Sequence, residues 1–207
     1  MDKTIFESFE DYLEEADYPQ GKKKIMRSAV ELISTKGYDG TSTLNIAEHA
    51  GLSQATLFKY FKTKVDLLTA ILHPVVPGLF GSFFEELLTF ETTEEKVHYF
   101  VHNRMSYLKK NRALIKIIFH EIFSNNKLRN EQKFIWNTIQ DKLQKFHKEL
   151  LADPRVDPDL TIPQMARICV GPLLAYFAQL YIIGDNGEMG EEDLDLLEKQ
   201  ILGGLWK

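Results

Sequence analysis

A short basic and aromatic stretch, SQATLFKYFKTK at residues 53–64, combines side chains that suit a nucleic acid. Glutamine can pair with the edge of an adenine, and lysine can donate to guanine or to phosphate oxygens. The chain has a formal net charge of -5, but residues 18–64 hold eight lysines and arginines against three acidic residues. Because local potential decides whether a surface attracts phosphate, this segment is a candidate nucleic-acid interface.

The helical periodicity around this stretch predicts the elements that would position it. An amphipathic helix is expected to end at Gly37, and a second helix is expected to start at an N-cap, Thr41 or Ser42. Ser53 can cap a third helix that runs from Gln54 to about Phe61. The second and third helices are joined by only four residues, AGLS. This spacing predicts a helix-turn-helix motif, whose second helix enters the major groove of DNA.

The apolar residues of this motif divide into two expected groups. Those that would lock the two helices together are Ile46, Ala47, Leu52 and Leu57. Those that would hold the third helix to its scaffold are Leu57, Phe58 and Phe61. Polar residues are expected on or near the exposed side. A Ser-capped amphipathic helix can also be an ordinary solvated surface helix, and this alternative stays open.

The same part of the chain also resembles a known protein family. The segment TSTLNIAEHAGLSQATLFKYFKTKVDLL, preceded by TKGYDGTS, resembles the DNA-binding signature of the TetR family of bacterial transcriptional regulators, over roughly residues 22–72. By position, the resemblance implies DNA contacts from Lys24, Ser42, Thr43, Leu44, Ser53, Gln54, Ala55, Thr56, Lys59, Tyr60 and Lys64. Two positions depart from the family pattern: Phe58 stands where many members have Tyr, and Leu44 stands where Arg is common.

The rest of the chain reads as all-α. Further helices are expected over 65–90, with an interruption between Pro74 and Gly78, and then over 93–109, 112–124, 127–151, 161–183 and 191–206. We therefore expect three parts: an acidic leader at 1–19, a helix-turn-helix domain at 20–66, and a helical ligand-binding and dimerisation domain at 67–207. The leader has helical spacing of apolar residues. It is expected either to pack loosely on the body or to weaken non-specific DNA binding.

The C-terminal helices suggest a dimer and a pocket. The segment 161–183 is apolar nearly all round, so it must be covered on more than one side, and with 191–206 it could form half of an intersubunit four-helix bundle. The family resemblance implies the same dimer and a ligand cavity between the preceding helices. The candidate ligand residues are Phe83, Phe100, Arg104, Tyr107, Phe119, Phe123, Trp136, Ile139 and Tyr176. Such aromatic stripes are also typical of an ordinary core.

Several other classes of function receive less support from the sequence. One cysteine, Cys169, excludes an intramolecular disulfide, the N-terminus lacks the pattern of a signal peptide, and no apolar run reaches about 18 residues. We therefore expect a cytoplasmic protein without membrane contact, and we expect no enzyme activity, cofactor or metal ligand. Two alternatives remain: an interaction module that uses helix 161–183, and an enzyme with a metal centre at His98 and His102. That centre would need further ligands, for which Glu94, Glu95, Glu121 and Asp141 are candidates.

The leading hypothesis is a homodimeric regulator of transcription that binds double-stranded operator DNA. The resemblance further implies a repressor that a small, largely hydrophobic effector releases from its operator. If the ligand prefers a conformation in which the two DNA-reading helices of the dimer are wrongly spaced, then ligand binding must weaken DNA binding. By the same linkage, DNA binding must weaken ligand binding.

Overall fold

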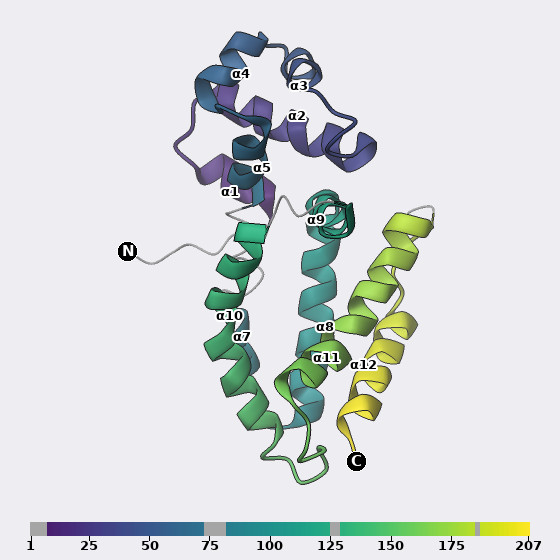
Figure 1. The fold of residues 1–207 in the computed structure, drawn as a ribbon. Helices are drawn as coiled ribbons and strands as arrows, with labels where there is room; N and C mark the ends of the chain where they lie inside the picture. The colour runs from purple at the N-terminus through teal and green to yellow at the C-terminus, as the bar shows by residue number, and fades with distance from the viewer. Residues whose placement is uncertain (1–7, 73–81, 125–128, 185–186) are drawn as a thin grey trace. The chain divides into compact units, whose positions relative to one another are not determined.

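The computed structural model describes residues 8–72, 82–124, 129–184 and 187–207, and for residues 119–138 within these ranges it describes the backbone alone. The described elements are helices, as the sequence predicts, with one isolated bridge between Val156 and Trp206 (Figure 1). The chain forms two compact units. The first unit lies within residues 1–79 and 110–136, and the second within residues 80–109 and 137–207.

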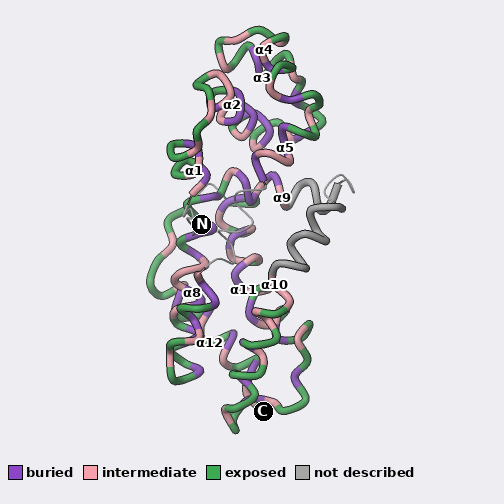
Figure 2. Tube along the Cα trace, turned by 90° about the vertical axis from the view of Figure 1, so that its left-hand side faces the viewer, coloured by how far each residue is buried: buried purple, intermediate pink, exposed green. Residues whose placement is uncertain are grey.

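The first unit is organised around a long central helix, α2. Its helices are α1 (Phe9–Glu15), α2 (Gln20–Lys36), α3 (Thr43–His49), α4 (Gln54–Tyr60), α5 (Lys64–Leu72) and α9 (Arg112–Ser124). Helix α2 packs against α3, α4, α5 and α9. Its apolar residues at helical spacing are buried, and Figure 2 shows buried segments along the α2 trace. Gly37 caps the end of α2, as expected.

Local capping fixes the ends of α3 and α4. Ser42, and not Thr41, is the N-cap of α3, where its hydroxyl accepts from the Asn45 amide at 3.0 Å. Ser53 caps α4 in the same way, through the Thr56 amide at 3.1 Å. Each cap satisfies a backbone donor that the first turn of a helix leaves without a partner in the helix.

The turn between α3 and α4 is a Schellman motif centred on Gly51. The Leu52 amide donates to the Ala47 carbonyl at 2.9 Å, and the Gly51 amide donates to Glu48 at 3.0 Å. Gly51 has a φ of 68°, in the left-handed region that glycine enters without a penalty. This geometry reverses the direction of the chain within four residues. Of the residues predicted to lock α3 onto α4, Ile46, Ala47 and Leu57 are buried and Leu52 is half-buried.

The described part of the acidic leader, from Ser8 onward, is packed more firmly than the sequence suggested. Phe9 and Leu13 of α1 are buried, with Leu13 at 0% exposure. The Phe9 amide donates to the buried Asn111 side chain at 3.2 Å, and the buried Lys23 ammonium donates to the Glu14 carbonyl at 3.1 Å. Loose packing was therefore the wrong expectation, because two anchored apolar residues and capping at both ends hold α1 in place. An effect of the leader on DNA binding stays a prediction.

The second unit contains the remaining helices. They are α7 (Phe83–Leu87), most of α8 (Thr93–Lys110), the later part of α10 (Arg129–Leu150), α11 (Ile162–Ala178), a π-helical turn η2 (Gln179–Ile183) and α12 (Glu191–Leu205). The predicted helices 93–109, 112–124, 127–151 and 191–206 are confirmed to within two residues at each end. The predicted 161–183 helix changes to π geometry after Ala178, and α5 ends at Leu72. The expected interruption between Pro74 and Gly78 lies outside the described residues.

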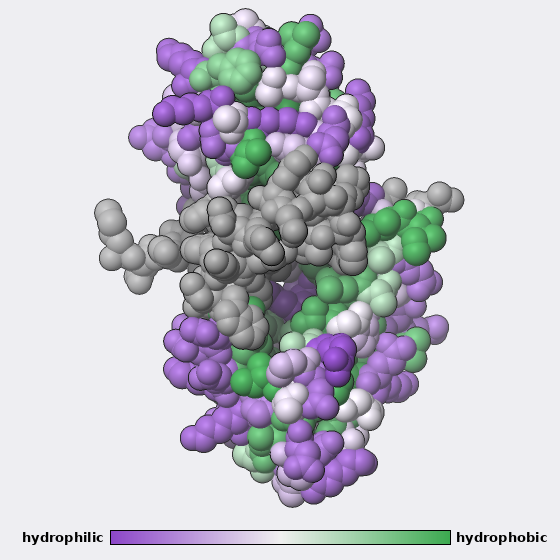
Figure 3. Space-filling view, viewed as in Figure 1, coloured by the Kyte–Doolittle hydropathy of each residue, from purple (hydrophilic) through white to green (hydrophobic). Residues whose placement is uncertain are grey.

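Helix α11 buries one face and leaves apolar side chains on others. Met165, Cys169, Leu173 and Phe177 follow one another at intervals of four and are buried. Burial raises the pKa of the Cys169 thiol to about 12, which fits a small apolar core residue better than a reactive thiol. Figure 3 shows apolar residues gathered along the visible side of α11. The large apolar residues left exposed on this helix, η2 and α12 are Val170, Ile182, Ile183 and Leu196.

The expectation that no apolar run reaches about 18 residues was wrong for Ile162–Ile183, which is long and apolar enough to cross a membrane, with a mean hydropathy of 1.5; 22% of its apolar window is buried. The core helices of globular proteins meet the same criterion. The expectation that the protein does not contact a membrane therefore stays a prediction.

Candidate functional site

The first candidate site is the exposed surface of α3 and α4. The N-termini of the two helices are joined by a hydrogen bond, in which the Gln54 amide donates to the Thr43 hydroxyl at 2.9 Å. The Thr56 hydroxyl lies 2.9 Å from that of Ser53. Ser42, Leu44, Ser53 and Ala55 are exposed, whereas Thr43, Gln54 and Thr56 are half-buried. The structure thus brings these predicted residues together, and Gln54 must share or break its bond with Thr43 to pair with a base.

Helix α4 faces its scaffold with Leu57 and Phe61, which are 0% and 4% exposed. Phe58 was also expected to hold α4 to the scaffold, and this was wrong: its exposure is 45%. The physical reason is the helical period, because the position after Leu57 lies about 100° further round the helix axis. Leu44 on α3 is exposed to 46%. The two positions that depart from the family pattern therefore both place an apolar side chain on the surface of the motif.

The basic residues of segment 18–64 divide into two groups. Four have internal contacts: Lys22 lies 3.5 Å above the Tyr18 ring, Lys23 caps α1, Arg27 pairs with Glu10 at 2.7 Å, and Lys64 contacts Tyr38. The four exposed ones are Lys24, Lys36, Lys59 and Lys62. A count of charges in the sequence could not separate these groups. Lys62 was not among the predicted contact residues, although the KTK run of the sequence contains it.

Two residues expected to contact phosphate have structural contacts as well. The Lys64 ammonium donates to the Tyr38 carbonyl and lies 3.8 Å above the Tyr38 ring, which connects the start of α5 to the turn after α2. Tyr60 is half-buried and packs on Gly21 in the first turn of α2, where a Cβ would lie 3.3 Å from the Tyr60 hydroxyl. A DNA contact from either residue stays a prediction.

The second candidate site surrounds Arg104 on α8. Its guanidinium lies 3.9 Å from the centre of the Phe83 ring and 5.2 Å from that of Tyr107, and it donates to the Asn103 side chain. Phe83 also packs on Phe100, with ring centres 5.8 Å apart. Phe83, Phe100 and Tyr107 are buried. Four of the predicted ligand residues therefore form one cluster in the second unit.

A polar chain continues from this cluster. Asn103 donates to the Tyr99 hydroxyl at 3.0 Å, and Tyr99 donates in turn to the Glu86 carboxylate. Burial lowers the pKa of Arg104 to about 10, so the side chain remains a cation at neutral pH. Burial and the bond to Glu86 raise the pKa of Tyr99 to about 12. The result is a half-buried cation among aromatic rings, which can attract an anionic group with an apolar neighbour.

The other predicted ligand residues are not brought into this cluster. The side chains of Phe119, Phe123 and Trp136 lie outside the described residues. Ile139 is half-buried on α10. The Tyr176 hydroxyl of α11 donates to the Asp193 carboxylate of α12. Burial is the main cause that raises the pKa of Tyr176, and this hydrogen bond is the second cause.

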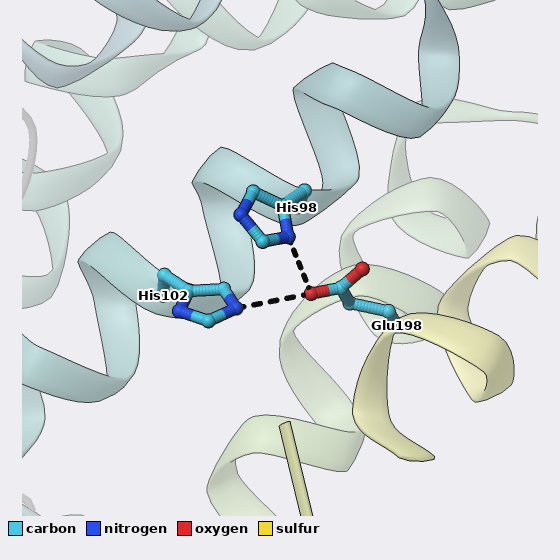
Figure 4. A group of neighbouring side chains, drawn as sticks. All are labelled: His98, His102 and Glu198. Carbon is cyan, nitrogen blue, oxygen red and sulfur yellow. Dashed lines mark hydrogen bonds and ion pairs between the residues drawn. The ribbon is translucent and has the colours of Figure 1, made fainter. Parts of the chain in front are cut away.

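The side chains of His98 and His102 contact a third side chain, Glu198, which was not among the expected ligands. The Glu198 carboxylate of α12 lies 2.8 Å from His98 Nδ1 and 3.2 Å from His102 Nε2 (Figure 4). Of the acids expected to complete a centre there, Glu94 pairs with Arg155 and Glu95 accepts from the Thr92 amide. The Glu121 side chain lies outside the described residues, and Asp141 is exposed on α10. Glu198 could not be assigned to this pair from the sequence pattern, because it lies 96 residues from His102 in the chain.

Comparisons with known proteins give one family-model match and several relatives named as transcriptional regulators. Residues 25–71 match the family model described as bacterial regulatory proteins, tetR family. The chain is 28% identical over 144 residues to the "Probable HTH-type transcriptional regulator YttP" of Bacillus subtilis, covering 64% of this chain and 69% of YttP. It is 31% identical over 106 residues to the "Uncharacterized HTH-type transcriptional regulator YvkB" of the same organism, covering 48% of this chain and 51% of YvkB. Both relatives are named as regulators of transcription and not as enzymes.

The fold is shared with a solved structure, the transcriptional regulator FadR from Bacillus subtilis in complex with stearoyl-CoA. The TM-score is 0.68 at 22% identity, over 87% of this chain and 95% of FadR. At this identity the likeness concerns the fold alone. The capped helix-turn-helix motif lies within the match at residues 25–71, so this part of the chain is the DNA-binding segment typical of the tetR family of bacterial regulatory proteins.

Proposed function

We propose that this regulator is a cytoplasmic, homodimeric repressor that binds operator DNA through α4 and leaves it when a small, largely hydrophobic ligand binds. The observation that carries the DNA-binding part is the Ser53-capped helix α4, which follows a four-residue turn and keeps Lys59 exposed. In a helix-turn-helix motif this helix is the one that enters the major groove.

The DNA interface would combine two kinds of contact. The exposed ammonium groups of Lys24, Lys59 and Lys62 suit phosphate oxygens, which fix the position of the protein on the duplex. The N-terminal residues of α3 and α4, around Thr43 and Gln54, suit the base edges. Helix-turn-helix dimers bind two half-sites one helical turn or a multiple apart, so we expect a palindromic operator.

Fluorescence anisotropy tests the DNA-binding part. We would measure affinity for DNA from upstream of the gene that encodes this protein, against a scrambled duplex, over a series of salt concentrations. Lys59→Ala should weaken binding to both duplexes and reduce the slope of log affinity against log salt by about 1. Lys148→Ala is the matched control, because Lys148 is an exposed lysine on α10 outside the first unit. Equal affinity for both duplexes at every salt concentration would contradict the proposal.

The ligand would carry an acidic group beside an apolar body. Arg104 is a cation at neutral pH and lies against Phe83 and Tyr107, so an anionic headgroup could bind there while the apolar part packs on the rings. A relative in fold, FadR, was solved with stearoyl-CoA, which has both of these features.

A titration of the protein–DNA complex tests the ligand part. Long-chain acyl-CoA should release the DNA, whereas free CoA should not, because it lacks the apolar chain. Arg104→Met keeps much of the apolar contact with the rings but removes the cation, so it should weaken the response to acyl-CoA while DNA binding without ligand is unchanged. If acyl-CoA releases wild type and Arg104→Met equally, Arg104 does not hold the anionic group.

A further inference from the structure

A cluster of His98, His102 and Glu198 joins two helices of the second unit. The two histidines lie one helical turn apart on α8, and their ring centres are 4.1 Å apart. Glu198 reaches them from α12, and one of its carboxylate oxygens faces both rings (Figure 4). All three candidate ligand atoms lie within 4.8 Å of one another.

The two helices hold these side chains in different ways. Glu198 stands beside the buried Leu197 on α12, and its own side chain is only 18% exposed. His102 is exposed to 32% and His98 to 62%, so the cluster is fixed on its carboxylate side and open to solvent on its imidazole side. A small ion could therefore reach the imidazole nitrogens from solvent.

The spacing of the ligand atoms is close to that of a metal site. Bonds of about 2.1 Å in tetrahedral geometry place neighbouring ligand atoms about 3.4 Å apart. The observed distances from the carboxylate oxygen to the two ring nitrogens are 2.8 and 3.2 Å. For an ion to replace the hydrogen bonds, the distance to His98 would have to widen by about 0.6 Å and that to His102 by about 0.2 Å.

We propose that His98, His102 and Glu198 bind a divalent transition metal ion of the zinc class. Two imidazole nitrogens and one carboxylate suit Zn²⁺ and similar ions, whereas Mg²⁺ and Ca²⁺ prefer sites made of oxygen ligands alone. Three protein ligands leave a further position for water or for another donor. This departs from our expectation of no metal ligand, and it goes beyond the proposed regulation by a hydrophobic ligand.

Bound metal would connect α8 to α12 by coordinate bonds instead of hydrogen bonds. Because the site needs both helices in their folded positions, the ion should stabilise the folded chain and have little affinity for the unfolded one. The ligands bind metal only when deprotonated, so protons should compete with the ion as the solution becomes acidic.

The test uses the full-length protein without a histidine tag, freed of metal with EDTA and then dialysed. Equilibrium dialysis against Zn²⁺ with metal analysis should give one saturable ion per chain, and the melting temperature should rise with Zn²⁺. His102→Gln and Glu198→Gln should each weaken binding at least tenfold. Circular dichroism checks that the variants keep their helices.

His49→Gln is the matched control. His49 is also an exposed histidine beside a glutamate, at 3.7 Å from Glu31, but it belongs to the first unit and has no second imidazole in that pair. Its replacement should leave Zn²⁺ binding unchanged. The proposal is overturned if wild type does not saturate at one ion per chain, if both site variants bind as wild type does, or if excess Mg²⁺ displaces the Zn²⁺.

Discussion

At the scale of single residues, Gly51 determines whether the turn between α3 and α4 can form. Its φ of 68° is a conformation that other L residues enter at a cost, and a Cβ added there would meet nothing within 4 Å. The penalty of a substitution should therefore come from the backbone alone. We expect Gly51→Ala to lower the free energy of unfolding by about 1 to 2 kcal/mol in urea titrations, because left-handed backbone costs that much.

Gly51→Asn provides the control for this prediction. Asparagine tolerates the left-handed region better than alanine does, so the Asn variant should be the more stable of the two. If both variants unfold at the urea concentration of wild type, the turn does not have the left-handed geometry described here.

Arg155 holds two carboxylates whose protonation should make the stability of the second unit depend on pH. Its guanidinium pairs with Glu94 at 2.5 Å and with Asp153 at 2.7 Å, and it lies 4.5 Å from the centre of the Trp206 ring. The hydrogen bonds from Arg155 hold the pKa of both carboxyl groups below their usual values. Because these pKa values are lowered in the folded state, the carboxylates stabilise the fold above their unfolded values of about 4.

This stabilisation should decrease as pH falls below about 4, where the unfolded carboxylates take up protons before the folded ones, and it should be lost once the pH falls through the lowered pKa values of the folded state. We expect Arg155→Met to lower the melting temperature at pH 7, and the difference from wild type to become smaller towards pH 3. The pairs are exposed, so the effect should be modest and should decrease with salt. Thermal melts over this range measure it, and a difference that is the same at every pH would exclude the ion pairs as its cause.

At the scale of elements, α11 and α12 approach closely at Gly204. A Cβ added at Gly204 would lie 2.8 Å from the Ile168 Cγ2 methyl group of α11, whereas one added at Gly203 would meet nothing within 4 Å of the same chain. Both glycines lie inside α12, where alanine is favoured over glycine by about 1 kcal/mol.

The two glycines therefore form a matched pair for mutation. We expect Gly203→Ala to raise the melting temperature, and Gly204→Ala to lose this gain or to fall below wild type, because the branched Ile168 side chain cannot move aside freely. Differential scanning calorimetry compares the two variants directly. Equal stabilisation by both would mean that α12 does not pack on α11 at the distance seen here.

At the scale of the whole molecule, the helices could be predicted from the sequence because their signals are local. Caps such as Ser42 and Ser53, and apolar residues at helical spacing, act within a few residues of each other. The same reasoning identified the helix-turn-helix motif. Part of the Arg104 cluster could also be predicted, because Arg104, Phe100 and Tyr107 share one helix, α8.

What could not be predicted depends on contacts between distant segments. The exposure of Phe58 follows from which side of α4 meets α2, and the partner of Lys64 lies 26 residues away. The approach of Glu198 to His98 joins residues 100 apart in the chain. Residue types and spacing set what each side chain can bind, but tertiary packing selects the partner that it meets.

The exposed apolar residues of α11, η2 and α12 lead to the last prediction, which concerns the proposed dimer. Val170 is exposed to 40% and Leu196 to 55%, and a Cβ at Gly171 would meet nothing within 4 Å in the protomer. Surfaces of this kind commonly mark contact sites between proteins, and a second copy of the chain would cover them in a four-helix bundle.

We expect the wild-type protein to have twice the chain mass of 24.0 kDa in light scattering coupled to size exclusion. Leu196→Glu should convert it to a monomer, because a carboxylate buried in an apolar interface has no partner for its charge. Leu44→Glu is the matched control, since Leu44 is a leucine of similar exposure, 46%, in the other unit. A dimer that persists in Leu196→Glu would show that this part of α12 is not in the interface. A monomeric wild type would instead favour another protein as the partner of these helices.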